Sequence, residues 1–248
     1  MFTPKSHKTQ LIKFVSNDPV VPLPVPIRRV VPEWYKKTPR YINGDKKPRV
    51  VVVPNKDGTG TSFEGNRSVK ACVPYFEAFT NGYAALLWHD LEIIRTPNGP
   101  EFRWIIGPTP MDARSSVGLE MLPVPAGHLS TQYVWNNPFA IQTPPGYSVL
   151  ITHPLNRYDL PFVTLSGIHD SDALLPNGHL PFYLREDFEG VIPRGTPIFH
   201  IFPYKRDNWI SEDGGEPMRF DSHRRGWEGM TKLIGDYKDR IWQKKQFD

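Results

Sequence analysis

The sequence predicts an all-β fold, a barrel or a sandwich, with an extended N-terminal segment and a C-terminal amphipathic helix. Two turns carry this prediction: Pro-Pro-Gly-Tyr precedes the apolar run Ser148–Ile151, and Pro-Arg-Gly-Thr-Pro precedes Ile198–Phe202. Both runs are short and rich in β-branched and aromatic residues, as strands bounded by turns are. The chain has 27 Pro and 19 Gly in 248 residues. These prolines separate apolar runs, which is typical of a turn-rich β protein.

We expect one β domain over residues 1–223, since a chain of this length can bury a substantial core. Its first part, residues 1–49, is expected to wrap around the domain in extended form. Within it, proline alternates with apolar residues over Val20–Val31, which favours extended or polyproline-like backbone. Pro32–Lys37 predicts a short helical turn, because proline opens it and lysines close it.

Further apolar runs between turns predict the other strands in order. They are Leu11–Val15, Val50–Val53, Gly82–Trp88, Leu91–Arg95, Pro100–Ile106, Ser130–Asn136 and Phe139–Thr143. Thr96-Pro97-Asn98-Gly99 is expected to join two of them in a hairpin, because Asn-Gly favours a tight turn. Asn55–Asn66 is polar and contains glycine, so we expect a loop there. Ala71–Thr80 predicts a strand end followed by a helical turn.

The predicted C-terminal helix spans residues 224–248 and is expected to pack on the β domain. No proline occurs between Arg225 and Lys245, and apolar residues recur there at helical spacing. These residues are Trp227, Met230, Leu233, Ile234, Tyr237, Ile241 and Trp242.

Composition argues against several classes of function. The formal charge is only +4, and the basic residues occur as separate pairs, whereas a nucleic-acid face needs a longer basic surface with interleaved aromatics. The single cysteine, Cys72, excludes an internal disulfide and favours a reducing intracellular setting. No apolar stretch approaches the length of a membrane span, and the N-terminus lacks the apolar core of a signal peptide. We therefore expect a soluble, cytoplasmic protein without membrane or nucleic-acid partners.

The candidate ligand-binding residues are His153, Asn156, Arg157, Asp170 and Asp172, which follow or lie between the predicted strands. A guanidinium offers a planar fork for an anion, so Arg157 could hold a ligand. It could equally pair with a nearby aspartate to hold its own turn. Asp170 could act as a general base beside Asp172, or both could cap the backbone of their turn.

The candidate metal ligands are His153, His169 and His200, with His179 in the same region. A cupin-like iron or zinc site needs histidines and a carboxylate that converge from neighbouring strands. The sequence lacks the His-x-His pair with which such a site usually begins. A single histidine is more often a hydrogen-bonded turn or core residue, so we predict no cofactor.

The segment Pro144–Pro203 resembles the trimeric dUTPase and dCTP-deaminase barrels of the β-clip class. Residues 167–172 (Gly-Ile-His-Asp-Ser-Asp) match the family's Gly-x-x-Asp-x-Asp turn, and residues 194–198 (Arg-Gly-Thr-Pro-Ile) resemble the entry to its last strand. The match places Asp170 at the position of the family's water-activating carboxylate. By this resemblance we expect a homo-oligomer, a trimer.

The family's phosphate-contacting residues are not matched. His153-Pro154-Leu155 stands where the family has Arg-Ser, Ala173 stands where it has tyrosine, and no glycine-rich tail is present. A triphosphate needs several positive or backbone donors around it. The resemblance therefore implies a shared scaffold without the shared reaction.

Taken whole, the chain resembles uncharacterised proteins of cyanobacterial myovirus-type phages and of some bacteria. The segments that prompt this are PVPIRRVVPEWYKKTPRY, ITHPLNRYDLPF and FEGVIPRGTPI. This resemblance implies a place in the host cytoplasm or the virion, with phage structural proteins as partners. The expected function is a non-catalytic or degenerate dUTPase-like barrel that serves as an accessory or virion-associated protein or binds a small polar ligand. The alternative is a metal-dependent enzyme on a cupin-like barrel, and a third reading is a purely structural assembly subunit.

Overall fold

The computed structural model describes residues 9–16, 18–47, 49–54, 60–114, 122–173, 178–213 and 242–248. The chain divides into two compact units. Unit 1 contains Met1–Val30, Asn81–Asp207 and Phe247–Asp248, and unit 2 contains Val31–Thr80 and Asn208–Gln246. Residues 31–80 thus group apart from the strands that flank them in sequence. The single β domain expected over residues 1–223 stays a prediction.

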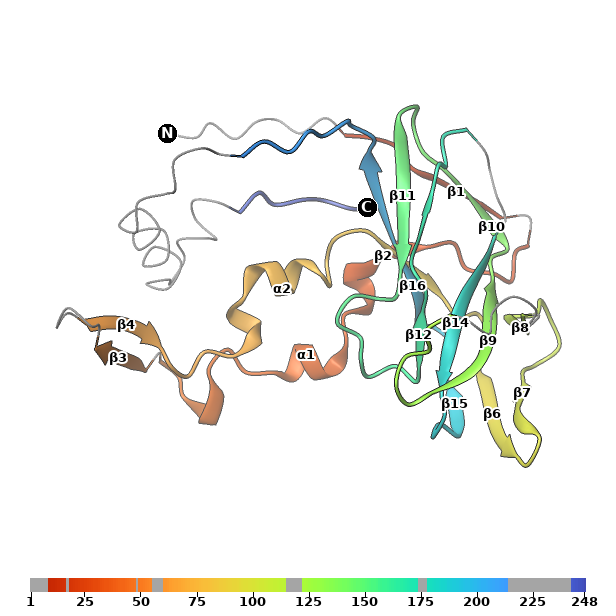
Figure 1. Ribbon diagram of the computed structural model, residues 1–248, viewed down its shortest axis with the longest axis horizontal. Helices are drawn as coiled ribbons and strands as arrows, with labels where there is room; N and C mark the ends of the chain where they lie inside the picture. The colour runs from red at the N-terminus through yellow and green to blue at the C-terminus, as the bar shows by residue number, and fades with distance from the viewer. Residues whose placement is uncertain are drawn as a thin grey trace. The chain divides into compact units, whose positions relative to one another are not determined.

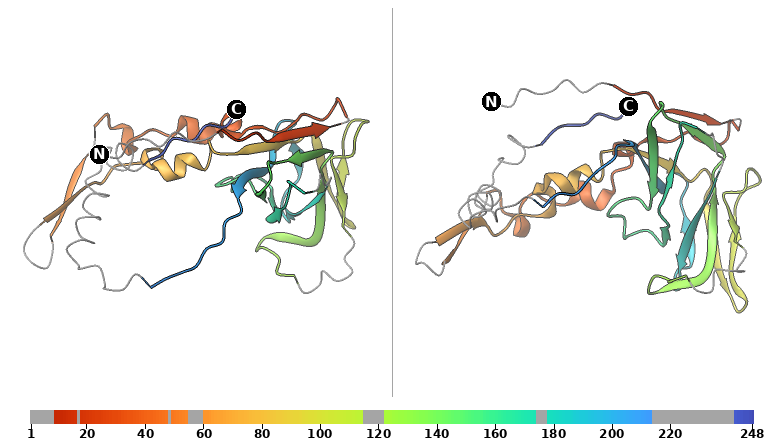
Figure 2. Two further views of the ribbon diagram at one scale, coloured as in Figure 1. Left: turned by 90° about the horizontal axis from the view of Figure 1, so that it is seen from above. Right: turned by 45° about the horizontal axis from the view of Figure 1, so that its top comes forward.

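Unit 1 consists of antiparallel strands arranged in four sheets (Figure 1). The orders are β13-β11-β16-β5-β2, β12-β14-β9-β8, β15-β6-β7 and β1-β10. The strands are β1 (Lys13–Ser16), β2 (Val25–Pro26), β5 (Tyr83–Leu86), β6 (Leu91–Thr96), β7 (Gly99–Arg103), β8 (Met111–Ala113), β9 (His128–Asn136), β10 (Phe139–Gln142), β11 (Tyr147–Thr152), β12 (Phe162–Thr164), β13 (Gly167–His169), β14 (His179–Arg185), β15 (Gly190–Ile192) and β16 (Pro197–Lys205). The strands from residue 128 to residue 205, coloured green to blue, stay close together in both further views (Figure 2).

The two segments that predicted the fold class pair directly with each other. β11 runs antiparallel to β16, with Val149 opposite Pro203 and Ile151 opposite Ile201. Residues 197–201 of β16 are all buried, as expected for a central strand covered on both faces. The predicted all-β class is confirmed, and the described strands form several antiparallel sheets that do not close into a barrel.

The three largest sheets share one apolar core. The four-stranded sheet contributes stacked rings: Trp135 and Phe182 lie parallel with their centroids 3.9 Å apart. Burial of such aromatic side chains is a large favourable term in folding. The other fully buried side chains of the cluster include Leu87, Leu91, Ile93, Val149, Ile151, Phe162, Leu184, Ile198, Phe199 and Ile201.

The predicted strands before residue 144 are confirmed with small shifts at their ends. The hairpin expected across residues 96–99 is present, since β6 pairs with β7 and Thr96 lies opposite Gly99. β7 ends at Arg103, so the run predicted over Pro100–Ile106 leaves the sheet before its last residues. Leu87 and Trp88 are buried although β5 ends at Leu86.

The N-terminal segment is extended only in part. β1 pairs with β10, as Phe14 lies opposite Ile141. A 3-10 turn, η1 (Ile27–Val30), follows β2. The backbone expected to be extended over Val20–Val31 therefore turns before its end. Proline disfavours helical backbone at the residue that precedes it, so Pro24 and Pro26 act only on their close neighbours. Ile27–Val30 contains no proline and can therefore form the turn.

Unit 2 begins with the predicted helical turn. α1 (Glu33–Lys37) starts directly after Pro32, and η2 (Ile42–Gly44) follows. β3 (Val50–Pro54) confirms the strand predicted over Val50–Val53 and pairs with β4 (Gly60–Glu64). The loop expected over Asn55–Asn66 is corrected by this pairing, because Thr61-Ser62-Phe63 continues a hairpin; residues 55–59 lie outside the described residues.

The next part of unit 2 is helical. η3 (Val69–Ala71) and α2 (Val73–Glu77) occupy the region where a strand end and a helical turn were expected over Ala71–Thr80. The helical turn is confirmed, and the strand end is corrected to a 3-10 turn capped by the Ser68 hydroxyl, which accepts the Lys70 N–H.

Most of the helix predicted over 224–248 lies outside the described residues, which resume at Trp242. Residues 242–248 have no helical structure. In unit 2 the Trp242 indole N–H donates to the Glu77 carboxylate at 2.6 Å, and the Lys245 ammonium lies 2.8 Å from the same carboxylate. No helix within the described ranges has the length and apolar character of a membrane span.

Candidate functional site

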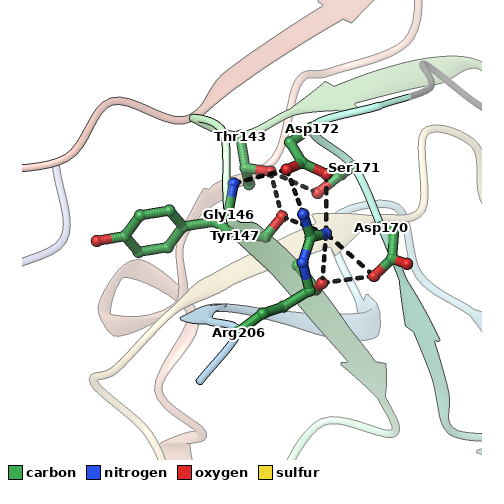
Figure 3. A network of polar contacts seen from close by, with 8 residues as sticks. Thr143, Gly146, Tyr147, Asp170, Ser171, Asp172 and Arg206 are labelled. Carbon is green, nitrogen blue, oxygen red and sulfur yellow. Dashed lines mark hydrogen bonds and ion pairs between the residues drawn. The ribbon is translucent and has the colours of Figure 1, made fainter. Parts of the chain in front are cut away.

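The two aspartates predicted from the sequence meet an arginine that the sequence analysis did not single out (Figure 3). The Arg206 guanidinium points between Asp170 and Asp172. Its Nη1 lies 2.8 Å from Asp172 Oδ1 and 3.2 Å from Asp170 Oδ1, and its Nη2 bonds Asp172 Oδ2. The ends of β13 and β16 lie on either side of β11. This arrangement brings Arg206 to the aspartates across the sheet.

The turn before β11 completes this group, which we call the Arg206 cluster (Gly146, Tyr147, Ser148, Asp170, Asp172 and Arg206). The Gly146 N–H donates to Asp172 Oδ2 at 2.6 Å, and the Ser148 hydroxyl donates to Asp170 Oδ1 at 2.6 Å. The Arg206 N–H donates to the Gly146 carbonyl at 2.8 Å. Gly146 has φ +81°, a conformation that glycine adopts without strain.

A pair of buried hydroxyls lies beside the Arg206 cluster. Thr143 Oγ1 and Ser171 Oγ are 2.9 Å apart, and Thr143 Oγ1 also donates to the Tyr147 carbonyl at 3.0 Å. Buried polar groups need such partners to avoid a large desolvation penalty. These contacts fix the Pro-Gly turn against the segment that carries the aspartates.

The electrostatics of the Arg206 cluster keep both carboxylates ionised. Hydrogen bonds from Arg206 and from the Gly146 N–H lower the pKa of Asp172 to about 2. The Ser148 hydroxyl, and then the Arg206 charge, lower the pKa of Asp170. A carboxylate whose pKa is lowered binds a proton more weakly, so each group is a weaker base than an unpaired aspartate.

The second predicted group lies in the turn after β11. His153 Nε2 bonds the Arg157 carbonyl at 3.0 Å, and its Nδ1 accepts the Thr164 N–H at 3.3 Å. Arg157 Nε and Nη2 lie 2.9 and 3.0 Å from the two carboxylate oxygens of Asp159. The Arg157–Asp159 pair that the sequence left open is therefore present. Asn156 has φ +58°, which asparagine tolerates better than most residues.

The three candidate metal-binding histidines come from separate elements of unit 1, and His169 directly precedes Asp170 in the sequence. His200 is fully buried in β16, where its Nε2 donates to the Asn81 carbonyl at 2.6 Å. Burial lowers the pKa of His200 to about 4, and burial also lowers the pKa of His153. His169 lies on β13 opposite Val149. Within the described ranges, no three or more His, Cys, Asp or Glu side chains are placed to hold a metal ion.

The structure thus brings Asp170 and Asp172 together and keeps His153, Asn156 and Arg157 in a separate turn. Arg206 follows the last predicted strand in an ordinary basic stretch, so its sequence neighbours carry no signal for its role. No protein-family model and no curated protein matches this sequence.

Proposed function

We propose that this protein acts by binding and not by catalysis. It is a β-clip-like, homo-oligomeric protein that serves a phage as an accessory or virion-associated protein, or that binds a small polar ligand. One observation carries the non-catalytic part: Arg206 pairs with both Asp170 and Asp172. In the enzymes that the sequence resembles, the carboxylate at the position of Asp170 activates water. Here Ser148 and Arg206 stabilise its anion, which weakens it as a base.

The loss of the phosphate-contacting residues supports the same proposal. His153 stands in place of the family's arginine and uses both ring nitrogens within its own turn. Arg157, a cation in the same turn, makes two bonds to Asp159, and its side chain is only 12% exposed. Neither residue is available to surround a triphosphate with donors.

The β-clip assignment rests on three turns that resemble those of the dUTPase-like family and that adjoin strands of one sheet. The Pro144–Tyr147 turn opens β11, residues 167–172 begin with β13, and residues 194–198 enter β16. These three strands are neighbours in the order β13-β11-β16. The oligomer and the phage association rest on the resemblances alone.

A turnover assay tests the non-catalytic part. Purified protein is incubated with dUTP or dCTP and Mg²⁺, and the release of pyrophosphate and of ammonia is measured. We expect no turnover above the buffer blank, for the wild type and for Asp170→Asn alike. Hydrolysis or deamination at enzyme-like rates that Asp170→Asn abolishes would overturn the proposal.

The same preparation tests the remaining parts. Light scattering after size-exclusion chromatography is expected to give a trimer, and a monomer would remove the oligomeric part. Mass spectrometry of purified virions is expected to find the protein at a fixed copy number. Elemental analysis addresses the metal-dependent alternative: stoichiometric iron, zinc or manganese that is lost in His153→Ala and His169→Ala would favour an enzyme.

A further inference from the structure

A hollow of about 470 Å³ opens in unit 1 between the outer strands of two sheets. β7 is the last strand of the three-stranded sheet, and β8 is the last strand of the four-stranded sheet. We call this site the β7–β8 hollow; it is lined by Asn98, Gly99, Pro100, Phe102, Trp104, Thr109, Met111, Asp112, Ala113, Thr131 and Tyr133. Its volume lies within the roughly 300–1,000 Å³ typical of small-ligand sites. It shares no residue with the Arg206 cluster.

The apolar part of the β7–β8 hollow is aromatic and is held by the core. Tyr133 is buried, and its ring meets the Phe102 ring edge-on with the centroids 4.8 Å apart. Phe102 and Trp104 are partly buried and pack against the core cluster. Aromatic surfaces that are fixed before a ligand arrives lose little entropy on binding.

The rim of the β7–β8 hollow is polar and exposed. Asn98, Thr109, Asp112 and Thr131 line the hollow and are exposed residues. Asp112 Oδ1 accepts the Ala113 N–H at 2.9 Å. This leaves Oδ2 without a protein donor in the part of the chain that the structure describes. The rim therefore offers both acceptors and donors to a ligand.

The Trp104 indole differs from three other buried or partly buried indoles among the described residues. Trp88, Trp135 and Trp242 each donate their N–H to a protein acceptor, at 2.9, 3.1 and 2.6 Å. The Trp104 N–H has no acceptor among the described residues. Trp104 lines the hollow, and a half-buried indole with an unused N–H can offer a ligand both apolar ring surface and a hydrogen-bond donor.

We propose that the β7–β8 hollow binds a neutral saccharide through one pyranose ring. The C–H face of a pyranose matches the rings of Trp104 and Phe102, and its hydroxyls match Asp112 and the other rim groups. Asp112 is the one formally charged residue among the described residues that line the hollow, and its negative charge disfavours a phosphorylated ligand. A wholly apolar ligand would leave the polar rim unpaired. This inference does not depend on the proposed function.

Saturation-transfer NMR on the full-length wild-type protein tests the proposal. Glucose, galactose, mannose and N-acetylglucosamine are offered separately at millimolar concentrations, beside glucose 6-phosphate and uridine. We expect transfer to the C–H protons of at least one neutral sugar, and weaker transfer to glucose 6-phosphate than to glucose. Absence of transfer to all four sugars overturns the proposal. Transfer to uridine alone also overturns it, because the hollow would then accept a nucleobase.

Three variants locate the binding. Trp104→Ala is expected to weaken the sugar's affinity about tenfold or more, as loss of a central aromatic contact does. Asp112→Asn keeps an acceptor for the Ala113 N–H and is expected to weaken affinity several-fold. Trp209→Ala removes an indole that is 89% exposed outside the hollow and is expected to leave affinity unchanged. Equal affinities for Trp104→Ala, Asp112→Asn and the wild type would place the sugar elsewhere and overturn the assignment.

Discussion

The Thr164 hydroxyl donates a hydrogen bond to the Ile198 carbonyl at 2.6 Å and thereby joins β12 of the four-stranded sheet to β16 of the five-stranded sheet. The same oxygen accepts the Trp135 indole N–H at 3.1 Å. All three residues are buried. One hydroxyl therefore satisfies a donor and an acceptor that have no access to water, and it fixes how the two sheets face each other.

Replacing Thr164 by valine removes this hydroxyl and keeps the shape of the side chain. We expect Thr164→Val to lower the free energy of unfolding by about 2–4 kcal/mol, because the Trp135 N–H and the Ile198 carbonyl lose their shared partner. Thr164→Ser keeps the hydroxyl and is expected to lose about 1 kcal/mol for the missing methyl group. Urea unfolding followed by tryptophan fluorescence measures both. Equal losses for the two variants would contradict the bridging role.

Gly82 is required where the chain enters β5. It has φ +87°, and a Cβ there would lie 2.5 Å from the Ile201 carbonyl oxygen and 2.9 Å from His200 Nε2. We expect Gly82→Ala to lower the free energy of unfolding by at least about 3 kcal/mol, since backbone strain adds to the clash. Gly195 has φ +83° and no atom within 4 Å of its Cβ position, so Gly195→Ala is expected to lose only about 1 kcal/mol. Thermal unfolding of both variants gives the comparison, and equal losses would argue against a clash at Gly82.

The buried His200 makes stability depend on pH. Its pKa is about 4 in the folded protein, because burial disfavours the charged ring, and ordinary histidine has a pKa of about 6.5. Between these values the unfolded chain takes up a proton that the folded chain does not, so stability falls as pH drops from about 6.5 to about 4. The total fall attributable to His200 is about 3 kcal/mol.

His200→Gln is expected to remove that part of the pH dependence. Urea unfolding at intervals between pH 7 and pH 4 compares the variant with the wild type. A smaller fall is expected to remain, because burial lowers the pKa of His153 as well. A variant curve parallel to that of the wild type would show that His200 does not titrate as its burial requires.

The pairing of Asp172 with Arg206 is expected to appear directly in a carboxyl titration. The pKa of Asp172 is about 2, with the Arg206 hydrogen bond as its largest cause, so the stability that this pair contributes is lost as pH falls toward 2. We expect Arg206→Gln to raise the pKa of Asp172, though not fully to its ordinary value, because the Gly146 N–H remains. Arg185→Gln breaks a separate exposed pair with Asp187 and serves as the control. An unchanged Asp172 pKa in Arg206→Gln, measured by carbon-detected NMR, would contradict the pairing.

Local signals in the sequence identified most strands. The Asn-Gly turn predicted the β6–β7 hairpin, and the Pro-Gly turns predicted β11 and β16, since each signal lies within a few residues of the element it defines. β4 was missed because Gly60–Glu64 is mostly polar and becomes a strand through its pairing with β3. The grouping of residues 31–80 apart from their flanking strands was not anticipated, because these residues carry no boundary signal of their own.

The candidate site was predictable only where its members are sequence neighbours. Asp170 and Asp172 are two residues apart, and their closeness follows from the turn. Arg206 reaches them across β11, because β13 and β16 pair with opposite edges of that strand. This strand order depends on long-range pairing, which residue types alone do not reveal. His200 lies in a run of residues that are all buried. The usual alternation of apolar and polar residues along a strand is absent there, so the sequence did not indicate which face of the sheet carries its ring.

The position of β16 between β5 and β11 has a consequence for biosynthesis. β16 is the last of these three strands to leave the ribosome, so until residues 197–205 emerge, β5 and β11 each expose an edge that nothing else in the sheet covers. The pairing of β5 with β16 joins segments that are far apart in the sequence, and such long-range pairing forms more slowly than local contacts do. Exposed edges of this kind invite pairing with other chains. The nascent protein is therefore most prone to aggregation during the interval before β16 inserts, and chaperone dependence should be greatest then.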